Sequence, residues 1–153
     1  AEDFPTLIGN NLNVPIVNAG VSGDTTTDAL KRIDTDVISK NPSIVVVELG
    51  ANDFLLQQDI AVTQRNLDTI LNKIRRSGAK IVIVGIKFFL FTEKYETNWQ
   101  ALAKKYDAVY VPDIMEGIIN EPSLKYDDIH PNAQGYKKIA YKLTPVLAPL
   151  VAK

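Results

Sequence analysis

The single histidine of the chain lies in the segment 127–132, which reads Asp-Asp-Ile-His-Pro-Asn. His130 follows Asp127 by three positions, and an imidazole beside a carboxylate is the usual arrangement of a general base that a carboxylate orients. A lone histidine is more often a core or capping residue, but the aspartate spacing and the following Pro-Asn favour catalysis. We therefore expect His130 to accept a proton and Asp127 to orient its ring.

Two glycine-rich turns, at residues 20–24 and 50–53, each follow an apolar run. We expect both turns to supply hydrogen-bond donors to an anion. Gly23 has no side chain, so its backbone amide can approach a reacting carbonyl closely, and Asn52 offers a neutral side-chain donor. Asp24 and Asp53 are expected to brace these turns rather than to bind a metal, because a metal site would need more histidines or clustered carboxylates.

The elements that position these residues are short apolar runs alternating with helical patterns. Strands are expected at residues 16–20, 44–49, 81–84 and 108–111, and helices at 5–12, 28–39, 62–76, 94–105 and 133–143. Gly78 is a stop signal for the third helix, and Pro145 and Pro149 are expected to bend or end the tail of the last. Such alternation predicts an α/β domain with a parallel sheet.

A parallel sheet brings the candidate residues together, because ligands bind beyond the carboxyl ends of its strands. Gly23 and Asn52 each lie just past an expected strand end. The segment from Asp127 to His130 follows the last strand and can return to the same edge. We therefore expect three segments that are distant in sequence to converge there.

Length and composition narrow the range of possible functions. The chain has 153 residues, enough for one domain with its own core, and its zero cysteines exclude disulfides and thiolate catalysis. Its formal net charge of -1 provides no overall field to hold nucleic acid or an anionic membrane, which favours a small-molecule substrate. No apolar stretch approaches the roughly 20 residues of a membrane span, and no signal peptide is recognised.

Three segments together resemble conserved blocks of a hydrolase family. They are residues 18–25 (Asn-Ala-Gly-Val-Ser-Gly-Asp-Thr), 48–53 (Glu-Leu-Gly-Ala-Asn-Asp) and 127–132. In this order and spacing they look like three of the four blocks of the SGNH hydrolases, also called GDSL esterases and lipases. They most resemble the arylesterase and lysophospholipase L1-like thioesterase branch. The resemblance extends from near residue 4 to near residue 145, and three blocks in order are far more specific than one.

The resemblance implies a role for each candidate residue. His130 would be the general base and Asp127 its orienting carboxylate, while the Gly23 backbone amide and the Asn52 side chain would form the oxyanion hole. It implies hydrolysis of carboxylic esters or thioesters through an acyl-enzyme, without a cofactor. The fold it implies is a flavodoxin-like three-layer αβα sandwich with a parallel sheet. It is compatible with a periplasmic or secreted protein, although the residues themselves indicate no compartment.

The family's first block, Gly-Asp-Ser-Leu with the nucleophilic serine, does not occur in these 153 residues. None of the serines follows Gly-Asp; they are Ser22, Ser39, Ser43, Ser77 and Ser123. Ser22 alone lies at the expected active edge and is the one stand-in for the nucleophile. Serine is common at this position in the family, however, which favours a turn residue that bonds its own backbone.

The missing block would also remove a strand from the sheet. In the resembling fold the strand that carries the serine lies between those expected at 16–20 and 44–49, and its loss would leave two bare apolar edges. We therefore expect residues 1–153 to be an N-terminally incomplete part of a single domain of this family. An N-terminal segment or a partner chain would complete it. If the chain folds alone, its first strand should pair directly with its second.

The substrate is less well defined. Phe88, Phe89 and Phe91 follow the third strand and could line an acyl or aryl pocket, with Tyr95 and Trp99 beyond them. The alternative is that these rings pack as ordinary core. Two other functions stay open: a carbohydrate O-deacetylase of the same fold, and a noncatalytic module that binds an acyl or glycan ligand if the nucleophile is truly absent. A flavodoxin-like binder would fit the strands but not Asn52 and His130.

Overall fold

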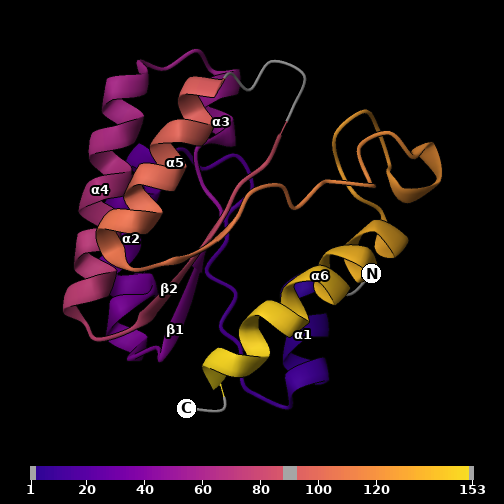
Figure 1. The fold of residues 1–153 in the computed structure, drawn as a ribbon, viewed down its shortest axis with the longest axis horizontal. Coiled ribbons are helices and arrows are strands. Elements are labelled where there is room, and N and C mark those ends of the chain that lie inside the picture. Colours follow the sequence, from indigo (N-terminus) through magenta and orange to yellow (C-terminus); the bar gives the residue numbers. More distant parts are fainter. Residues whose placement is uncertain (1–2, 88–92, 152–153) are drawn as a thin grey trace. The chain divides into compact units, whose positions relative to one another are not determined.

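A computed structural model describes residues 3–87 and 93–151 (Figure 1). Its residues group into two compact units, one formed by Ala19–Asp113 and the other by Ala1–Asn18 with Ile114–Lys153. Parallel strands and helices alternate through the first unit, so the expected α/β class is confirmed.

The unit Ala19–Asp113 contains a three-stranded parallel sheet in the order β1-β2-β3. Its strands are β1 (Ile44–Val47), β2 (Lys80–Val84) and β3 (Val109–Val111). Val47 lies opposite Ile83, and Val84 lies opposite Val111. These strands are the ones expected at 44–49, 81–84 and 108–111, and each pair is joined by a crossover helix as parallel pairing requires.

The strand expected at residues 16–20 is wrong. This stretch has no strand conformation, and Ile16 and Val17 are 41% and 65% exposed. An extended segment becomes a strand only through hydrogen bonds to a neighbour, and apolar composition cannot supply that neighbour. The alternative in which it pairs with the next strand is therefore wrong as well. Within the described sheet β1 pairs with β2 alone, which makes β1 an edge strand.

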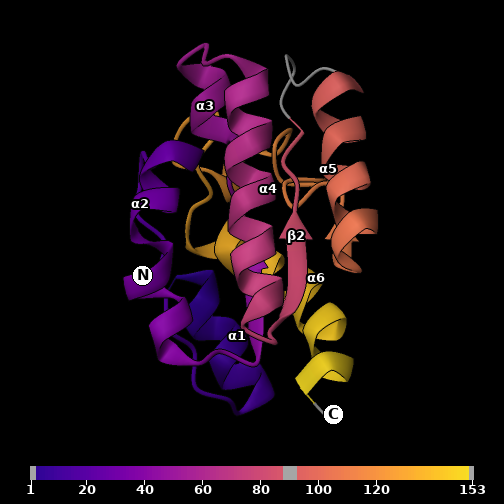
Figure 2. The same cartoon turned by 90° about the vertical axis from the view of Figure 1, so that its left-hand side faces the viewer.

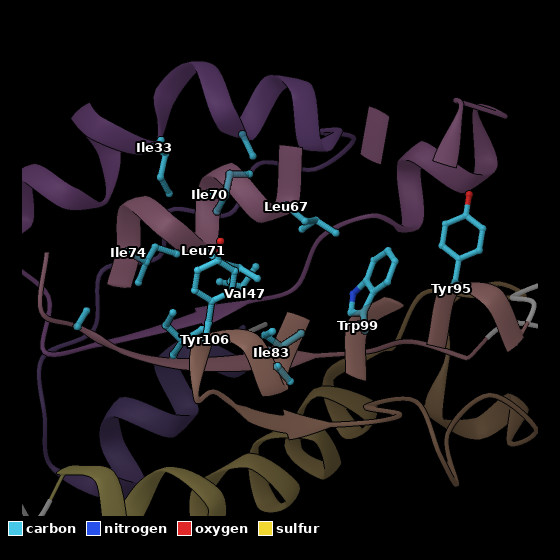
Figure 3. Packing of buried hydrophobic residues seen from close by; sticks show 14 residues of the cluster. Ile33, Val47, Leu67, Ile70, Leu71, Ile74, Ile83, Tyr95, Trp99 and Tyr106 are labelled. Atoms are coloured by element: carbon cyan, nitrogen blue, oxygen red, sulfur yellow. The ribbon is translucent and has the colours of Figure 1, made fainter. Parts of the chain in front are cut away.

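Three helices share one hydrophobic core with the sheet of this unit: α2 (Thr26–Asp36), α4 (Ile60–Arg76) and α5 (Glu93–Tyr106). Helix α4 lies between α2 and α5 (Figure 2). Ile33, Ile74 and Trp99 come from the three helices and belong, with Ile83 of β2, to this one core (Figure 3). Each helix presents apolar residues at intervals of three or four, which places them on one face.

The ends of these helices follow from local sequence. Thr25 caps α2 through a reciprocal pair of bonds with Asp28, a capping box. Helix α4 ends at Arg76, and Gly78 follows with a φ of +87°, which confirms the expected stop signal. The helix expected at residues 28–39 is divided into α2 and the 3-10 helix η1 (Ile38–Lys40), and the short helix α3 (Ala51–Leu55) was not expected.

The second unit contains α1 (Phe4–Leu12), α6 (Ala133–Val151) and the short 3-10 helix η2 (Pro122–Leu124). Helices α1 and α6 pack side by side, with the Phe4 and Tyr136 rings 6.2 Å apart. Pro145 and Pro149 were expected to bend or end the tail of the last helix; the second alternative is wrong, because α6 continues through both prolines. In the part of the chain that the structure describes, no helix has the length and apolar character needed to cross a membrane.

Candidate active site

The segment that carries Gly23 is a tight turn leading into α2. The Asp24 N–H donates to the Val21 carbonyl over 3.2 Å, and Gly23 has a φ of +85°, in the left-handed region that favours glycine. Ser22 and Gly23 are exposed within this turn. The capped start of α2 follows at once, so the turn continues into a rigid element.

Asn52 lies in the first turn of α3, where it reaches the segment of Gly23. Its Nδ2 donates to the backbone carbonyl of Asp24 over 2.9 Å. The amide has a second N–H, for which the described residues provide no acceptor. The structure thus joins two of the three predicted segments within the unit Ala19–Asp113.

Gly50, which precedes α3, allows this helix to begin close to α5. Its φ is +103°, and a Cβ built on it would lie 2.5 Å from Cζ2 of Trp99. Any larger residue would therefore force the indole and the start of α3 apart. The close approach of Trp99 helps to fix the helix turn on which Asn52 lies.

A buried carboxylate adjoins Asn52. Asp53 is fully buried and accepts hydrogen bonds from the Thr26 N–H (2.9 Å), from the Thr26 hydroxyl and from the Thr63 hydroxyl (3.1 Å). Asn66 donates in turn to the Thr26 hydroxyl over 3.2 Å. A buried charge is tolerated only when its oxygens are bonded in this way. The network fastens the starts of α2 and α3 to α4, which gives Asp53 the bracing role expected of it.

Asp127 and His130 form a direct pair in the second unit. His130 Nδ1 lies 2.8 Å from Asp127 Oδ2 and 3.0 Å from Oδ1. Oδ1 also accepts the backbone N–H groups of Ile129 (2.9 Å) and His130 (2.8 Å). These backbone bonds, followed by the bond to the ring, lower the pKa of Asp127 to about 2. The carboxylate is therefore charged at any physiological pH and available to orient the imidazole.

The loop that carries this pair is fixed to the start of α6. Asn132 Oδ1 accepts the N–H groups of Gln134 (2.9 Å) and Gly135 (3.1 Å), so Asn132 caps α6 as expected. Its Nδ2 donates to the Ser123 carbonyl over 2.8 Å. A Cβ on Gly135 would overlap the Leu124 carbonyl oxygen, which shows how closely the helix and the loop approach.

The predicted site residues divide between the two units. Gly23, Asn52 and the stand-in Ser22 lie in Ala19–Asp113, whereas Asp127 and His130 lie in the other unit. Convergence of all three segments therefore stays a prediction. Among residues 3–87 and 93–151, no three histidine, aspartate or glutamate side chains gather as a metal site requires.

Of the aromatic residues considered for the predicted substrate pocket, the structure describes only Tyr95 and Trp99. Phe88, Phe89 and Phe91 lie outside the described residues. Tyr95 and Trp99, which follow them, are 7% and 3% exposed and belong to the hydrophobic core, as the packing alternative expected.

Sequence reasoning missed the side chains that hold the Gly23 segment and the start of α3 in place, notably Arg32, Thr63 and Asn66. They lie on helices, where their polar types look like ordinary solvent-facing residues. The local pattern carries no signal that these side chains turn inward.

Comparisons with known proteins agree with one another. The model of the GDSL-like Lipase/Acylhydrolase family matches residues 1–138. Esterase TesA of Pseudomonas aeruginosa is 31% identical over 142 residues, which cover 89% of this chain and 71% of that protein. Thioesterase 1/protease 1/lysophospholipase L1 of Escherichia coli (strain K12) is 32% identical over 156 residues, covering 97% of this chain and 75% of that protein. The solved structure of TesA matches with a TM-score of 0.90 at 29% identity, over 97% of this chain and 88% of that chain.

Proposed function

Because the chain belongs to the GDSL-like lipase/acylhydrolase family, we propose that it hydrolyses carboxylic esters or thioesters with His130 as general base and Asp127 as its orienting carboxylate. The observation that carries these roles is the 2.8 Å contact between His130 Nδ1 and Asp127 Oδ2. A carboxylate at Nδ1 keeps the ring proton there and leaves the lone pair on Nε2. Nε2 is then the atom that takes a proton from the nucleophile.

The proposed reaction has two halves. A serine hydroxyl adds to the carbonyl carbon, its proton passes to His130 Nε2, and the carbonyl oxygen becomes an oxyanion. The Gly23 backbone N–H and the second N–H of the Asn52 amide donate to this oxyanion. Collapse expels the alcohol or thiol, which takes the proton from His130. The acyl-serine is then hydrolysed by water through the same steps.

The nucleophile is a separate part of the proposal. No Gly-Asp-Ser occurs in residues 1–153, and we propose that a serine in this setting is supplied from outside them, by the same polypeptide or by a partner chain. The open edge of β1 supports this, since Val46 is 39% exposed there and an unpaired strand edge can accept another strand. Ser22 is the competing candidate within the chain. Intact mass and N-terminal sequencing of the natural protein would show whether such a segment belongs to it.

The test of this function is an assay of the natural protein on p-nitrophenyl acetate, longer p-nitrophenyl esters and an acyl thioester. We expect turnover that His130→Ala abolishes. Asp128→Asn is the matched control, because Asp128 is the adjacent carboxylate and contacts Lys125 only through its backbone carbonyl. Activity that survives His130→Ala would contradict the proposal.

The same preparation separates the alternatives. Release of acetate from acetylated sugars, with poor use of longer acyl chains, would identify a carbohydrate O-deacetylase. Binding of an acyl or glycan ligand without turnover, after the N-terminus is confirmed complete, would identify a noncatalytic module.

A further inference from the structure

One guanidinium group contacts both ends of the segment that carries Gly23. Arg32 Nε donates to Asp24 Oδ2 over 2.7 Å, and a terminal nitrogen of the same group donates to the Ala19 carbonyl over 2.6 Å. That nitrogen also lies 3.1 Å from Asp36 Oδ2, one turn further along α2. The Arg32 and Asp24 side chains are only 25% and 17% exposed, so water screens their pairing little.

The tip of this segment makes little packing contact. Val21, Ser22 and Gly23 are exposed, and apart from its chain neighbours no described residue has a heavy atom within 4 Å of the position that a Cβ on Gly23 would take. The direction of the Gly23 N–H therefore depends on what holds its flanks. Arg32 holds Ala19 on one side and Asp24 on the other, and Asn52 adds one bond to the Asp24 carbonyl.

We propose that Arg32 is a positioning residue for the oxyanion hole, which aims the Gly23 N–H by bonding to Ala19 and Asp24 at once. This inference rests on the proposed function, because it takes Gly23 as an oxyanion donor. Such a donor must lie about 2.7–3.1 Å from the oxyanion to be effective. A displaced Gly23 would lower the rate of the chemical step more than it lowers substrate binding.

The geometry requires arginine in particular. Its planar fork donates from several nitrogens in fixed directions, whereas a lysine ammonium is a single point of charge. Lysine at this position can still pair with Asp24, but it cannot also reach the Ala19 carbonyl in the same geometry. Arg32→Lys should therefore restore only part of the function that Arg32→Ala removes.

The first experiment measures kcat and KM of the natural protein on p-nitrophenyl acetate. We expect Arg32→Ala to lower kcat by up to about 10²-fold, the cost of a misplacement near 1 Å, with KM nearly unchanged. Arg32→Lys and Asp24→Asn should fall between Arg32→Ala and the parent. The control is Lys73→Ala, which removes the 2.8 Å ion pair of Asp34 on the same helix α2 without touching the segment 19–24.

The second experiment does not depend on turnover. The backbone amide signal of Gly23 is followed by two-dimensional ¹H–¹⁵N NMR in the natural protein, with thermal unfolding recorded for every variant. We expect Arg32→Ala to shift or broaden this signal at a temperature where the variant is still fully folded, and Lys73→Ala to leave it in place. If Arg32→Ala does not fold, Asp24→Asn takes its place because it keeps the side chain's shape.

The kinetic measurement and the NMR signal distinguish a failure of the proposed function from a failure of the inference about Arg32. If the protein has no esterase activity, the proposed function fails while the NMR signal still shows whether Arg32 holds the turn. The inference is overturned if Gly23 gives the same signal in Arg32→Ala as in Lys73→Ala. It is also overturned if kcat falls only in step with the folded fraction and Arg32→Lys restores none of it.

Discussion

The side-chain amide of Asn52 donates to the backbone carbonyl of Asp24 over 2.9 Å, so one side chain joins the two glycine turns of the unit Ala19–Asp113. The bond uses one of two amide hydrogens. The other has no acceptor among the described residues, and the bonded carbonyl belongs to Asp24, the residue after Gly23. In the proposed reaction a single asparagine holds the neighbouring turn and donates its second N–H to the oxyanion.

Replacing Asn52 by alanine should lower kcat on p-nitrophenyl acetate by about 10²- to 10³-fold, the usual effect of losing one oxyanion donor. KM should change much less, because the donor acts mainly on the charge of the transition state. Asn72→Ala, which removes an exposed asparagine from α4, is the control. Equal rates for the two variants would rule out the role given to Asn52.

Thr63→Val tests the network around Asp53. Valine keeps the shape of the side chain but removes the 3.1 Å bond to the buried carboxylate, which should lower the free energy of unfolding by about 1–3 kcal/mol. Thr69→Val is matched to it, since the Thr69 hydroxyl on the same helix bonds only the Arg65 carbonyl at an exposed position. Urea denaturation measures both. A loss no greater for Thr63 than for Thr69 would show that the network contributes little.

Gly23 and Gly50 provide a second matched pair. Both have a positive φ, so alanine at either should cost about 1–2 kcal/mol. Only at Gly50 does the new Cβ meet Trp99, at 2.5 Å, and overpacking of this kind adds about 1–3 kcal/mol. Denaturation curves should therefore show Gly50→Ala to be clearly the less stable variant. Similar curves for the two would contradict the contact between Gly50 and Trp99.

Much of the fold could be predicted because its signals are local. The apolar spacing on α4 and the glycine after it define that helix, and the short run at β2 defines a buried strand. The run that begins with Ile16 and Val17 also starts with β-branched apolar residues, but a strand depends on a partner that composition does not reveal. Ending the helix at Pro145 was the wrong alternative for a similar reason: a proline removes one helical hydrogen bond, while the neighbouring bonds and the burial of Leu147 sustain α6.

The site could be predicted where its residues are close in sequence. Asp127 and His130 are three positions apart, and their contact follows from a short turn. The contact between Arg32 and Asp24 and that between Asp53 and Thr63 arise from the packing of separate elements. In the sequence these residues are ordinary charged and polar side chains, and only the fold shows which of them meet.

The low pKa of Asp127 predicts the pH range in which acid weakens the loop 127–130. The folded-state pKa of about 2 lies below the ordinary value of 3.8, because backbone N–H groups bond the charged form. The carboxylate's support of the loop should therefore be complete above about pH 4 and lost as the pH falls through about 2. A ¹³C NMR titration of the carboxyl should give this low midpoint, and His130→Ala should keep most of the shift because the backbone bonds remain. A midpoint near 3.8 in the folded protein would contradict these bonds.

The most direct test of the central claim is labelling of the natural protein with a fluorophosphonate probe, followed by mass-spectrometric mapping of the modified serine. We predict one labelled serine in a Gly-Asp-Ser sequence, with labelling lost in His130→Ala and retained in Asp128→Asn. A folded protein that takes no label, a label on Ser22, or labelling that persists in His130→Ala would contradict the claim that Asp127 and His130 activate such a serine.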